Sequence, residues 1–542
     1  MTAFTHLPCG AAVIEATPAA AVCTRQAAPW ILAATVIASS MAFIDGTVVN
    51  VALPALQKDL NASIADAQWV IEAYSLLLAA LLLVGGAAGD RYGRRRLFLF
   101  GVVLFAAASV LCGLAGNARA LILARAVQGV GGALLVPGSL AIIGASFDAR
   151  ERGRAIGLWS GATAITGALG PVLGGWLIDQ WSWRAAFFIN VPLAAAVLVL
   201  ALAHVPESRN AEARGRLDWP GAALATLGLG GIVYGLIESS SRGFADAGVA
   251  AALVFGTLSL TGFAAAEFRE AAPMVPPSLF RSKTFLGANL LTLLLYSALG
   301  GALFFLPLNL IQVQHYSATA AGAALLPFIL LMATLSRWSG GLVGRYGARR
   351  PLIVGPLVAA AGFALFAWPS EGGSYWLTFF PAIAVLGLGM AIGVAPLTTA
   401  VMNAVDSAHE GAASGINNAA SRVAVVVAIA LFGVVFASVF NRGLDANLAR
   451  ARIPPEVVQI VEAERSKLAA IELPANIDEG VKAAARQAIA AAFVEGFRWI
   501  AIISALLAAA SAVIAGAMIE GAGTQVRAPP AGKTVATNRS AR

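Results

Sequence analysis

Three charged side chains stand inside apolar segments that are long enough to cross a membrane. Arg125 lies in LILARAVQGVGGALLVP, Asp45 in SSMAFIDGTVVNVALP and Glu72 in WVIEAYSLLLAALLLVGG. Placing an arginine in such a segment costs about 2.5–3.5 kcal/mol, so the charge is expected to have a partner or a function. We therefore predict that Arg125 pairs with one of the two carboxylates. The alternative is that its long side chain extends to the membrane surface.

The depth of the three charges favours pairing. Arg125 lies about six residues, or roughly 9 Å, from the Arg119 end of its segment, and Glu72 lies about four residues from the same side. Asp45 lies about fifteen residues, or roughly 22 Å, from the opposite side. All three fall in the same half of a bilayer core that is about 30 Å thick.

The composition is that of an integral membrane protein. Only 12% of the 542 residues are charged and 59% are hydrophobic, whereas a soluble domain has about 25% charged residues. The apolar runs are continuous and do not alternate, which indicates helices and excludes a barrel. We predict an all-α protein with fourteen membrane helices, at approximately 30–54, 68–89, 97–116, 119–146, 155–178, 184–204, 219–238, 245–266, 284–312, 317–342, 351–368, 375–402, 414–440 and 495–519.

Lysine and arginine positions predict the orientation. With the N-terminus in the cytoplasm, cytoplasmic segments carry 21 of the 36 basic residues and outer segments carry 11. The positive-inside rule therefore places both termini in the cytoplasm. The net charge of +8 is explained by this bias, so nucleic acid is not an expected partner.

A weak internal repeat divides the chain. GGAAGDRYGRRR after the second span is echoed by SGGLVGRYGARR after the tenth, where Gly344 replaces the aspartate. The repeat predicts two six-helix halves that are related by pseudo-symmetry, with a substrate site between them. The predicted boundaries are a cytoplasmic tail at 1–29, a first half at 30–205, a linker with two extra central helices at 206–283, a second half at 284–519, an outer loop at 441–494 and a cytoplasmic tail at 520–542.

Several motifs give the chain its resemblance to a known family. The segment after the second span resembles the motif of the major facilitator superfamily between helices 2 and 3, through Gly86, Asp90, Arg91, Gly93, Arg94 and Arg95. In that family the motif acts as a cytoplasmic latch. Leu121, Arg125, Gln128, Gly129 and Gly131 match the helix 4 motif. Gly170, Pro171, Gly174 and Gly175 resemble the antiporter motif of helix 5, although Thr166 stands where one glycine is expected.

The first span indicates which branch of the family the chain resembles. DGTVVNVALP, from Asp45 to Pro54, is similar to the signature of the fourteen-helix drug:proton antiporters, which include quaternary-ammonium and multidrug exporters. The likeness extends over about residues 30–520. Arg422 fits this branch, but alanine and valine replace the glycines expected after it.

The resemblance implies a secondary active transporter of the plasma membrane that exports drugs or other lipophilic, possibly cationic small molecules in exchange for protons. It would need no cofactor, because the proton gradient drives it, and it would work as a monomer. Asp45 and Arg125 are predicted to couple proton movement to transport. Glu72 would either join the proton relay or bind a cationic substrate. A proton-coupled exporter or importer of one metabolite and a non-transporting membrane sensor or scaffold are the alternatives.

Two further predictions concern the cavity and the outer loop. Six polar or aromatic residues in the ninth and thirteenth spans could line a substrate cavity together with Arg422, although helix packing is their ordinary role: Phe304, Phe305, Asn309, Gln312, Asn417 and Asn418. The loop 441–494 contains two helical segments, 454–473 and 478–493. These form either a lid over the outer mouth or a hairpin that rests on the membrane surface.

Other classes of protein lack support in the sequence. The four histidines are far apart, the three cysteines have no metal-ligand spacing, and no nucleophile stands near a base, so an enzyme or a metal site is not expected. The one Gly-Lys-Thr, at 532–534, has Arg527 where a phosphate-binding loop needs glycine. We therefore exclude transport driven by ATP.

Overall fold

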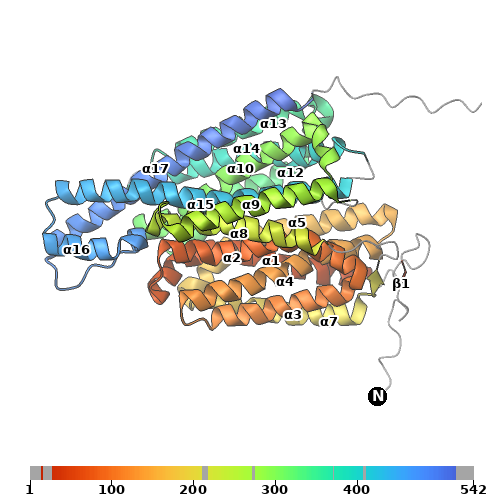
Figure 1. Ribbon diagram of the computed structural model, residues 1–542, viewed down its shortest axis with the longest axis horizontal. Coiled ribbons are helices and arrows are strands. Elements are labelled where there is room, and N and C mark those ends of the chain that lie inside the picture. Colours follow the sequence, from red (N-terminus) through yellow and green to blue (C-terminus); the bar gives the residue numbers. More distant parts are fainter. Residues whose placement is uncertain are drawn as a thin grey trace, which may run out of the picture.

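The computed structural model describes residues 14–15, 27–209, 218–270, 275–369, 371–406 and 410–520, and these form a bundle of long helices (Figure 1). The predicted spans correspond to α1 (Ala28–Leu60), α2 (Ile64–Tyr92), α3 (Arg94–Gly113), α4 (Ala118–Ser146), α5 (Ala149–Gln180), α6 with α7 (Ala185–Phe188, Asn190–His204), α8 (Trp219–Arg242), α9 (Ala247–Arg269), α10 (Lys283–Leu308), α11 with α12 (Ala318–Ala324, Leu326–Tyr346), α13 (Arg349–Leu365), α14 (Phe379–Asn403), α15 (Glu410–Arg450) and α17 (Glu479–Met518).

Each of the fourteen predicted spans is therefore helical. Thirteen helical segments of the described residues are long and apolar enough to cross a membrane. The remaining span, α13, has 17 helical residues. The smaller elements are α16 (Pro455–Ala463), the 3-10 helices η1 (Pro277–Arg281) and η4 (Arg465–Ala470), a π-helical turn η2 (Asn309–Val313), and the two-residue strands β1 (Ile14–Glu15) and β2 (Ser208–Arg209), which pair in parallel.

The helices begin where the sequence offers a capping side chain. Ser63 and Asp66 form a reciprocal capping box at the start of α2, and the side chain of Asn117 accepts a hydrogen bond from Ala120 N at the start of α4. Such caps satisfy backbone N–H groups that have no partner within the helix. Equivalent side-chain caps begin α8, α9, α10, α11 and α17, at Asp218, Asp246, Ser282, Ser317 and Asp478.

The bundle has two distinct ends. We call the end where α1 starts and α17 stops the terminal end. The opposite end is the hairpin end, because α15, α16 and α17 project beyond the other helices there (Figure 1). The tails at 1–29 and 520–542, apart from residues 14–15, 27–29 and 520, lie outside the described residues.

The first and second halves contact each other at the hairpin end. On α5, the Asp179 carboxylate accepts hydrogen bonds from Ala318 N (3.1 Å) and Thr319 N (2.8 Å) at the start of α11. Gln312 Nε2 donates to Gln57 Oε1 over 3.0 Å, and Gln68 Nε2 donates to the Ile429 carbonyl over 2.9 Å. These contacts close the hairpin end.

At the terminal end, several glycines of both halves adjoin open space. On the first turns of α5, a Cβ atom added at Gly153, Gly157 or Gly161 would have no described atom within 4 Å. The same holds for Gly340 and Gly344 on the last turns of α12. The described residues thus join the halves by hydrogen bonds at the hairpin end and leave open space beside these glycines at the terminal end.

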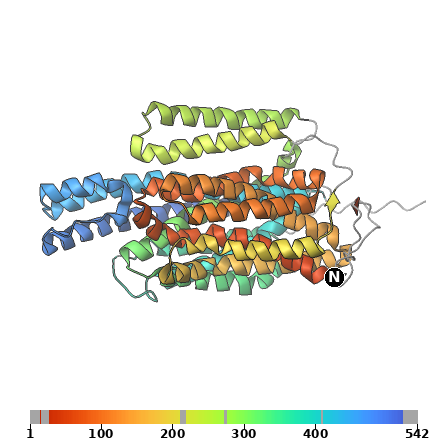
Figure 2. The same cartoon turned by 90° about the horizontal axis from the view of Figure 1, so that it is seen from below.

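The linker helices and the long loop complete the architecture. α8 and α9 lie together along one side of the bundle (Figure 2), where α8 packs against α2 and α15. The interpretation of 441–494 as a hairpin resting on the membrane surface was wrong. α15 continues to Arg450 and α17 already begins at Glu479, because their helical sequence pattern does not stop where the apolar pattern stops. α16 and η4 connect them. The hairpin thus projects along the helix axes, and η4 contacts α1 and α2.

Candidate functional site

Asp45 and Arg125 meet inside the first half. Asp45 lies in the middle of α1 and Arg125 in the second turn of α4, and their side chains are 0% and 1% exposed. Arg125 Nη1 donates to Asp45 Oδ2 in a short ion pair. The structure therefore brings together the two charges that were predicted to pair.

Three further polar side chains complete what we call the polar cluster: Gln128, Asn190 and Ser109. Gln128 Nε2 and Asn190 Nδ2 donate to Asp45 Oδ1 over 2.8 and 3.1 Å. Both amides also donate to Ser109 Oγ, over 2.7 and 3.2 Å. Asp45 therefore receives three N–H donors, which is the arrangement that suits an ionised carboxylate.

The guanidinium of Arg125 is held on its other sides as well. Its Nε donates to the Val70 carbonyl over 3.0 Å. Its Cζ lies 4.2 Å from the centre of the Tyr74 ring and 5.7 Å from that of Phe187. Cation–π contacts of this kind are stronger where water is excluded. Arg125 Nη1 also donates to Gln128 Oε1 over 2.6 Å. Because five groups fix the guanidinium, it does not extend to the membrane surface.

Glu72 lies outside the polar cluster. It is 0% exposed, and neither of its carboxylate oxygens has a hydrogen-bond partner among the described residues. Gln68, one helical turn earlier on the same face of α2, donates to α15 of the second half. Glu72 therefore faces the boundary between the halves, whereas Tyr74 faces Arg125.

The predicted cavity residues fall into two groups. Phe304 and Phe305 are 1% and 0% exposed, and Phe305 stacks on Phe436 with ring centres 4.4 Å apart. They therefore belong to the packed core of the second half and do not line an open cavity in this conformation. Asn309 is also buried, in the π-helical turn η2, and Gln312 belongs to the closed hairpin end.

The α15 residues of that prediction have different surroundings. Asn417 Nδ2 donates to Thr292 Oγ1 over 2.7 Å, and Asn418 is exposed. The Nε atom of Arg422 is buried without a hydrogen-bond partner among the described residues. Arg422 lies close enough to Tyr74 to interact with it electrostatically. Glu72 and Arg422 thus make no ion pair among the described residues, and Glu72 is buried whereas Arg422 is half-buried.

The motif between α2 and α3 forms a compact turn. Asp90 pairs with Arg94 over 2.7 Å, and Gly93 adopts φ +111°. The Glu207 carboxylate accepts hydrogen bonds from Arg95 N and Arg96 N at the start of α3. The positive φ favours glycine at position 93, and a side chain there would meet this carboxylate at 2.9 Å and displace it. Glu207 was not anticipated from the sequence.

The glycines of α5 allow three helices to approach closely. A Cβ atom at Gly170 or Gly174 would overlap Thr47 or Val48 of α1. A Cβ atom at Gly175 would overlap the Ala318 carbonyl of α11. Opposite it, the carbonyl of Pro171 would overlap a Cβ atom at Gly322 of α11. The predicted antiporter motif is thus a packing surface that joins α5 to α1 and to the second half.

Comparisons with known proteins agree with this architecture. Residues 35–429 match the family model described as Major Facilitator Superfamily. Multidrug resistance protein Stp of Mycobacterium tuberculosis is 34% identical over 80% of this chain and 80% of its own. The tetracenomycin C resistance and export protein of Streptomyces glaucescens is 36% identical over 69% of this chain and 70% of its own.

A solved structure shows the same fold. The bacterial homologue of the human lysosomal transporter Spinster, in an inward-facing and unoccupied conformation, superposes with a TM-score of 0.63. The alignment covers 92% of this chain and 98% of that one, at 18% sequence identity. Together with the family match and the similarity to drug-resistance proteins, this shows that the chain is a multi-pass membrane protein of the Major Facilitator Superfamily, in its drug-efflux branch.

Proposed function

We propose that the protein is a proton-coupled antiporter that exports drugs or other lipophilic small molecules. The observation that carries the proposal is the buried polar cluster, which holds an ion pair where water is scarce. The relatives named for multidrug, tetracenomycin C and puromycin resistance support export of drugs. A non-transporting sensor or an enzyme would not need such a pair between α1 and α4.

The proposed mechanism assigns a role to each member of the pair. Asp45 accepts a proton from the outer side when the hairpin end is open, which releases Arg125. In the conformation closed at that end, Arg125, Gln128 and Asn190 all donate to Asp45, an arrangement in which the carboxylate has given up its proton. The proton therefore leaves through the open terminal end while substrate enters from the same side. Differential stabilisation of the two conformations by proton and substrate couples their movements.

The orientation follows from the charge bias. We propose that the terminal end faces the cytoplasm and that the protein works as a monomer in the plasma membrane, without a cofactor. Arg91, Arg94, Arg95 and Arg96 lie at the terminal end, as the positive-inside rule requires.

Replacing Asp45 by asparagine tests the coupling role. Purified protein in liposomes should lose transport driven by a pH gradient, because the amide side chain cannot exchange a proton at physiological pH. Asp59→Asn is the matched control. Asp59 is on the same helix and pairs with Arg184 over 2.5 Å, but its side chain is 47% exposed, so this variant should transport normally. Full proton-driven transport by Asp45→Asn would remove Asp45 from the mechanism.

Glu72 is proposed to select for cationic substrates, since its buried carboxylate has no hydrogen-bond partner among the described residues and faces the boundary between the halves. Glu72→Gln should reduce export of a dicationic dye by roughly tenfold, or about 1.4 kcal/mol, with a smaller effect on a monocationic dye. The monocationic dye controls for folding and insertion. Equal export of both dyes would instead place Glu72 outside substrate recognition.

A carrier of one specific metabolite is the second candidate function. The tetracenomycin C exporter and the puromycin resistance protein are each named for a single antibiotic, which favours a narrow substrate range. A drug-susceptibility panel in cells that lack their own pumps, with and without a protonophore, separates the two functions. A multidrug exporter protects against several unrelated compounds, and the protonophore abolishes that protection.

A further inference from the structure

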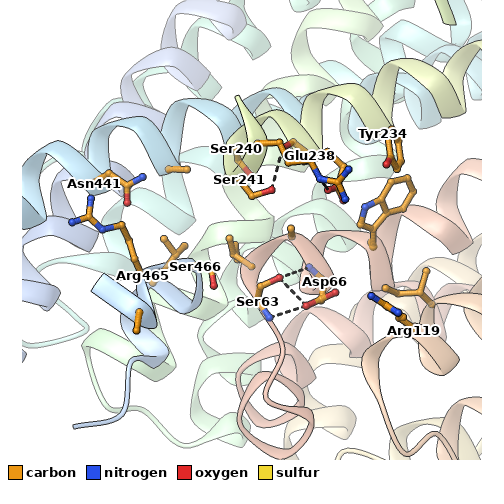
Figure 3. A pocket seen from close by; sticks show the side chains of 18 of the residues that line it. Ser63, Asp66, Arg119, Tyr234, Glu238, Ser240, Ser241, Asn441, Arg465 and Ser466 are labelled. Atoms are coloured by element: carbon orange, nitrogen blue, oxygen red, sulfur yellow. Dashed lines mark hydrogen bonds and ion pairs between the residues drawn. The ribbon is translucent and has the colours of Figure 1, made fainter. Parts of the chain in front are cut away.

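A cavity of about 1000 Å³ lies at the hairpin end (Figure 3). Its walls come from the first residues of α2 and α4, the last turns of α8, and from α15, α16 and η4. Three membrane helices begin or end at its rim, which places the cavity where the bilayer meets water. None of the polar-cluster residues lines it.

Most charges around the rim already have partners. Arg242 pairs with Glu238 over 3.1 Å, and Arg465 pairs with Asp445 over 2.5 Å. Asp66 caps α2 through Ser63, as Figure 3 shows. These groups are therefore held in place before any ligand arrives.

Arg119 is the exception. It is exposed, and it makes no hydrogen bond or ion pair within the described part of the chain. It occupies the first turn of α4, where the helix dipole adds positive potential. The lining as a whole is nevertheless balanced, because Arg119, Arg242 and Arg465 are matched by Asp66, Glu238 and Glu462. A ligand with one negative and one positive group fits this rim better than a ligand with a net charge.

Polarity falls off with depth on two of the walls. On α4, Arg119 and Leu123 line the cavity, and Val127 lies four residues beyond Leu123 on the same face, outside the lining. The two apolar side chains are 69% and 40% exposed. On α8, Tyr234 lies one turn below Glu238, and its ring is 6.1 Å from that of Trp69 on α2. Charged groups at the boundary, aromatic rings one turn deeper and aliphatic groups below them match the layers of a phospholipid.

We propose that this cavity binds the headgroup of a zwitterionic phospholipid, with its phosphate on Arg119 and its amine near Asp66 and Glu238. The acyl chains lie along Leu123 and Val127. The site is independent of proton coupling, since it shares no residue with the polar cluster. Arginine suits the phosphate because its planar group can donate two parallel hydrogen bonds.

The test is a titration of delipidated, full-length protein with phosphatidylethanolamine, followed by native mass spectrometry. Arg119→Ala should weaken binding of one lipid by about fivefold or more, since a hydrogen bond to a charged group is lost. Arg119→Lys should keep part of the affinity. Arg269→Ala is the control, because Arg269 is an exposed arginine at the end of α9 and does not line the cavity.

Two competing ligands sharpen the test. Phosphatidylglycerol, which carries a net negative charge, should bind less tightly than phosphatidylethanolamine, and millimolar inorganic phosphate should not displace the lipid. Equal loss of lipid in Arg119→Ala and Arg269→Ala would overturn the proposal. Displacement by inorganic phosphate would overturn it in favour of a free-anion site, and tighter binding of phosphatidylglycerol would exclude the zwitterionic headgroup. Thermal unfolding of each variant verifies that it is folded.

Discussion

The two halves of the bundle differ in the kind of side chains that are buried at their centres. In the first half, a charged pair and three polar side chains occupy the centre, and each of the five has a hydrogen-bond partner. In the second half, aromatic rings occupy the centre. Phe436 contacts both Phe305 and Phe493, with ring centres 4.4 and 4.8 Å apart. On the proposed mechanism, proton chemistry is confined to the first half, and the second half is a rigid body that moves against it.

The repeated motif shows the same asymmetry at the terminal end. In the first copy, Asp90 pairs with Arg94, and the Glu207 carboxylate accepts a hydrogen bond from a backbone N–H group at the start of α3. In the second copy, Gly344 replaces the aspartate, and Arg349 Nη2 donates to the Gly516 carbonyl of α17. The fold therefore keeps the turn in both halves but keeps the carboxylates in one.

The largest effect is expected from breaking the ion pair. Arg125→Met leaves Asp45 buried without its cation, which should destabilise the protein by about 3–5 kcal/mol and abolish proton-driven transport. The midpoint of thermal unfolding and transport in liposomes measure the two effects.

The double variant Asp45→Asn with Arg125→Met removes both charges. It should recover most of the lost stability but none of the coupling, because no unpaired charge remains buried. Arg184→Met, which removes an arginine whose side chain is 34% exposed, serves as the control. If Arg125→Met unfolds at the wild-type temperature, the pair does not stabilise the first half.

An intermediate effect is expected at the contact between the halves. Gly175→Ala places a methyl group against the backbone carbonyl of Ala318, which cannot move aside without separating α5 from α11. The ratio of closed to open molecules at the hairpin end should therefore fall by about tenfold or more, equivalent to about 1.4 kcal/mol. Distances between spin labels on α5 and α11 report this ratio.

Gly157→Ala is the matched control for that substitution. It adds a methyl group on the same helix where no described atom lies within 4 Å. Because alanine favours a helix over glycine by about 0.5–1 kcal/mol, this variant should be as stable as the wild type or more so. Unchanged spin-label distances in Gly175→Ala would show that α5 does not control closure.

The sequence allowed the depth of a charged residue to be predicted but not its direction around the helix. Asp45 and Arg125 pair at the shared depth that the sequence indicates. Glu72 shares that depth, yet it is separated from Tyr74 by two residues, or about 200° of helix rotation. Since Tyr74 faces Arg125, Glu72 must face elsewhere, and only packing fixes which residue faces the partner.

The roles of uncharged polar residues and the ends of the helices were also harder to predict, because hydropathy reports neither of them. Asn190 and Ser109 look like ordinary packing residues of membrane helices, because neither carries a charge that demands a partner. The apolar pattern ends near residue 440, but α15 continues to Arg450. Hydropathy marks the edge of the membrane, whereas helix propensity and caps decide where the helix ends.

The smallest effect is expected at the start of α3, where the first half differs from the second by a carboxylate. Glu207 accepts hydrogen bonds from Arg95 N (3.1 Å) and Arg96 N (3.2 Å), and it is the only cap described there, because Gly93 has no side chain. Glu207→Gln removes the negative charge from a helix N-terminus and should destabilise the protein by about 1 kcal/mol. Glu270→Gln, an exposed change beyond α9, should stay within about 0.5 kcal/mol of the wild type. Equal unfolding temperatures for the two variants would mean that the carboxylate at the start of α3 does not stabilise the first half.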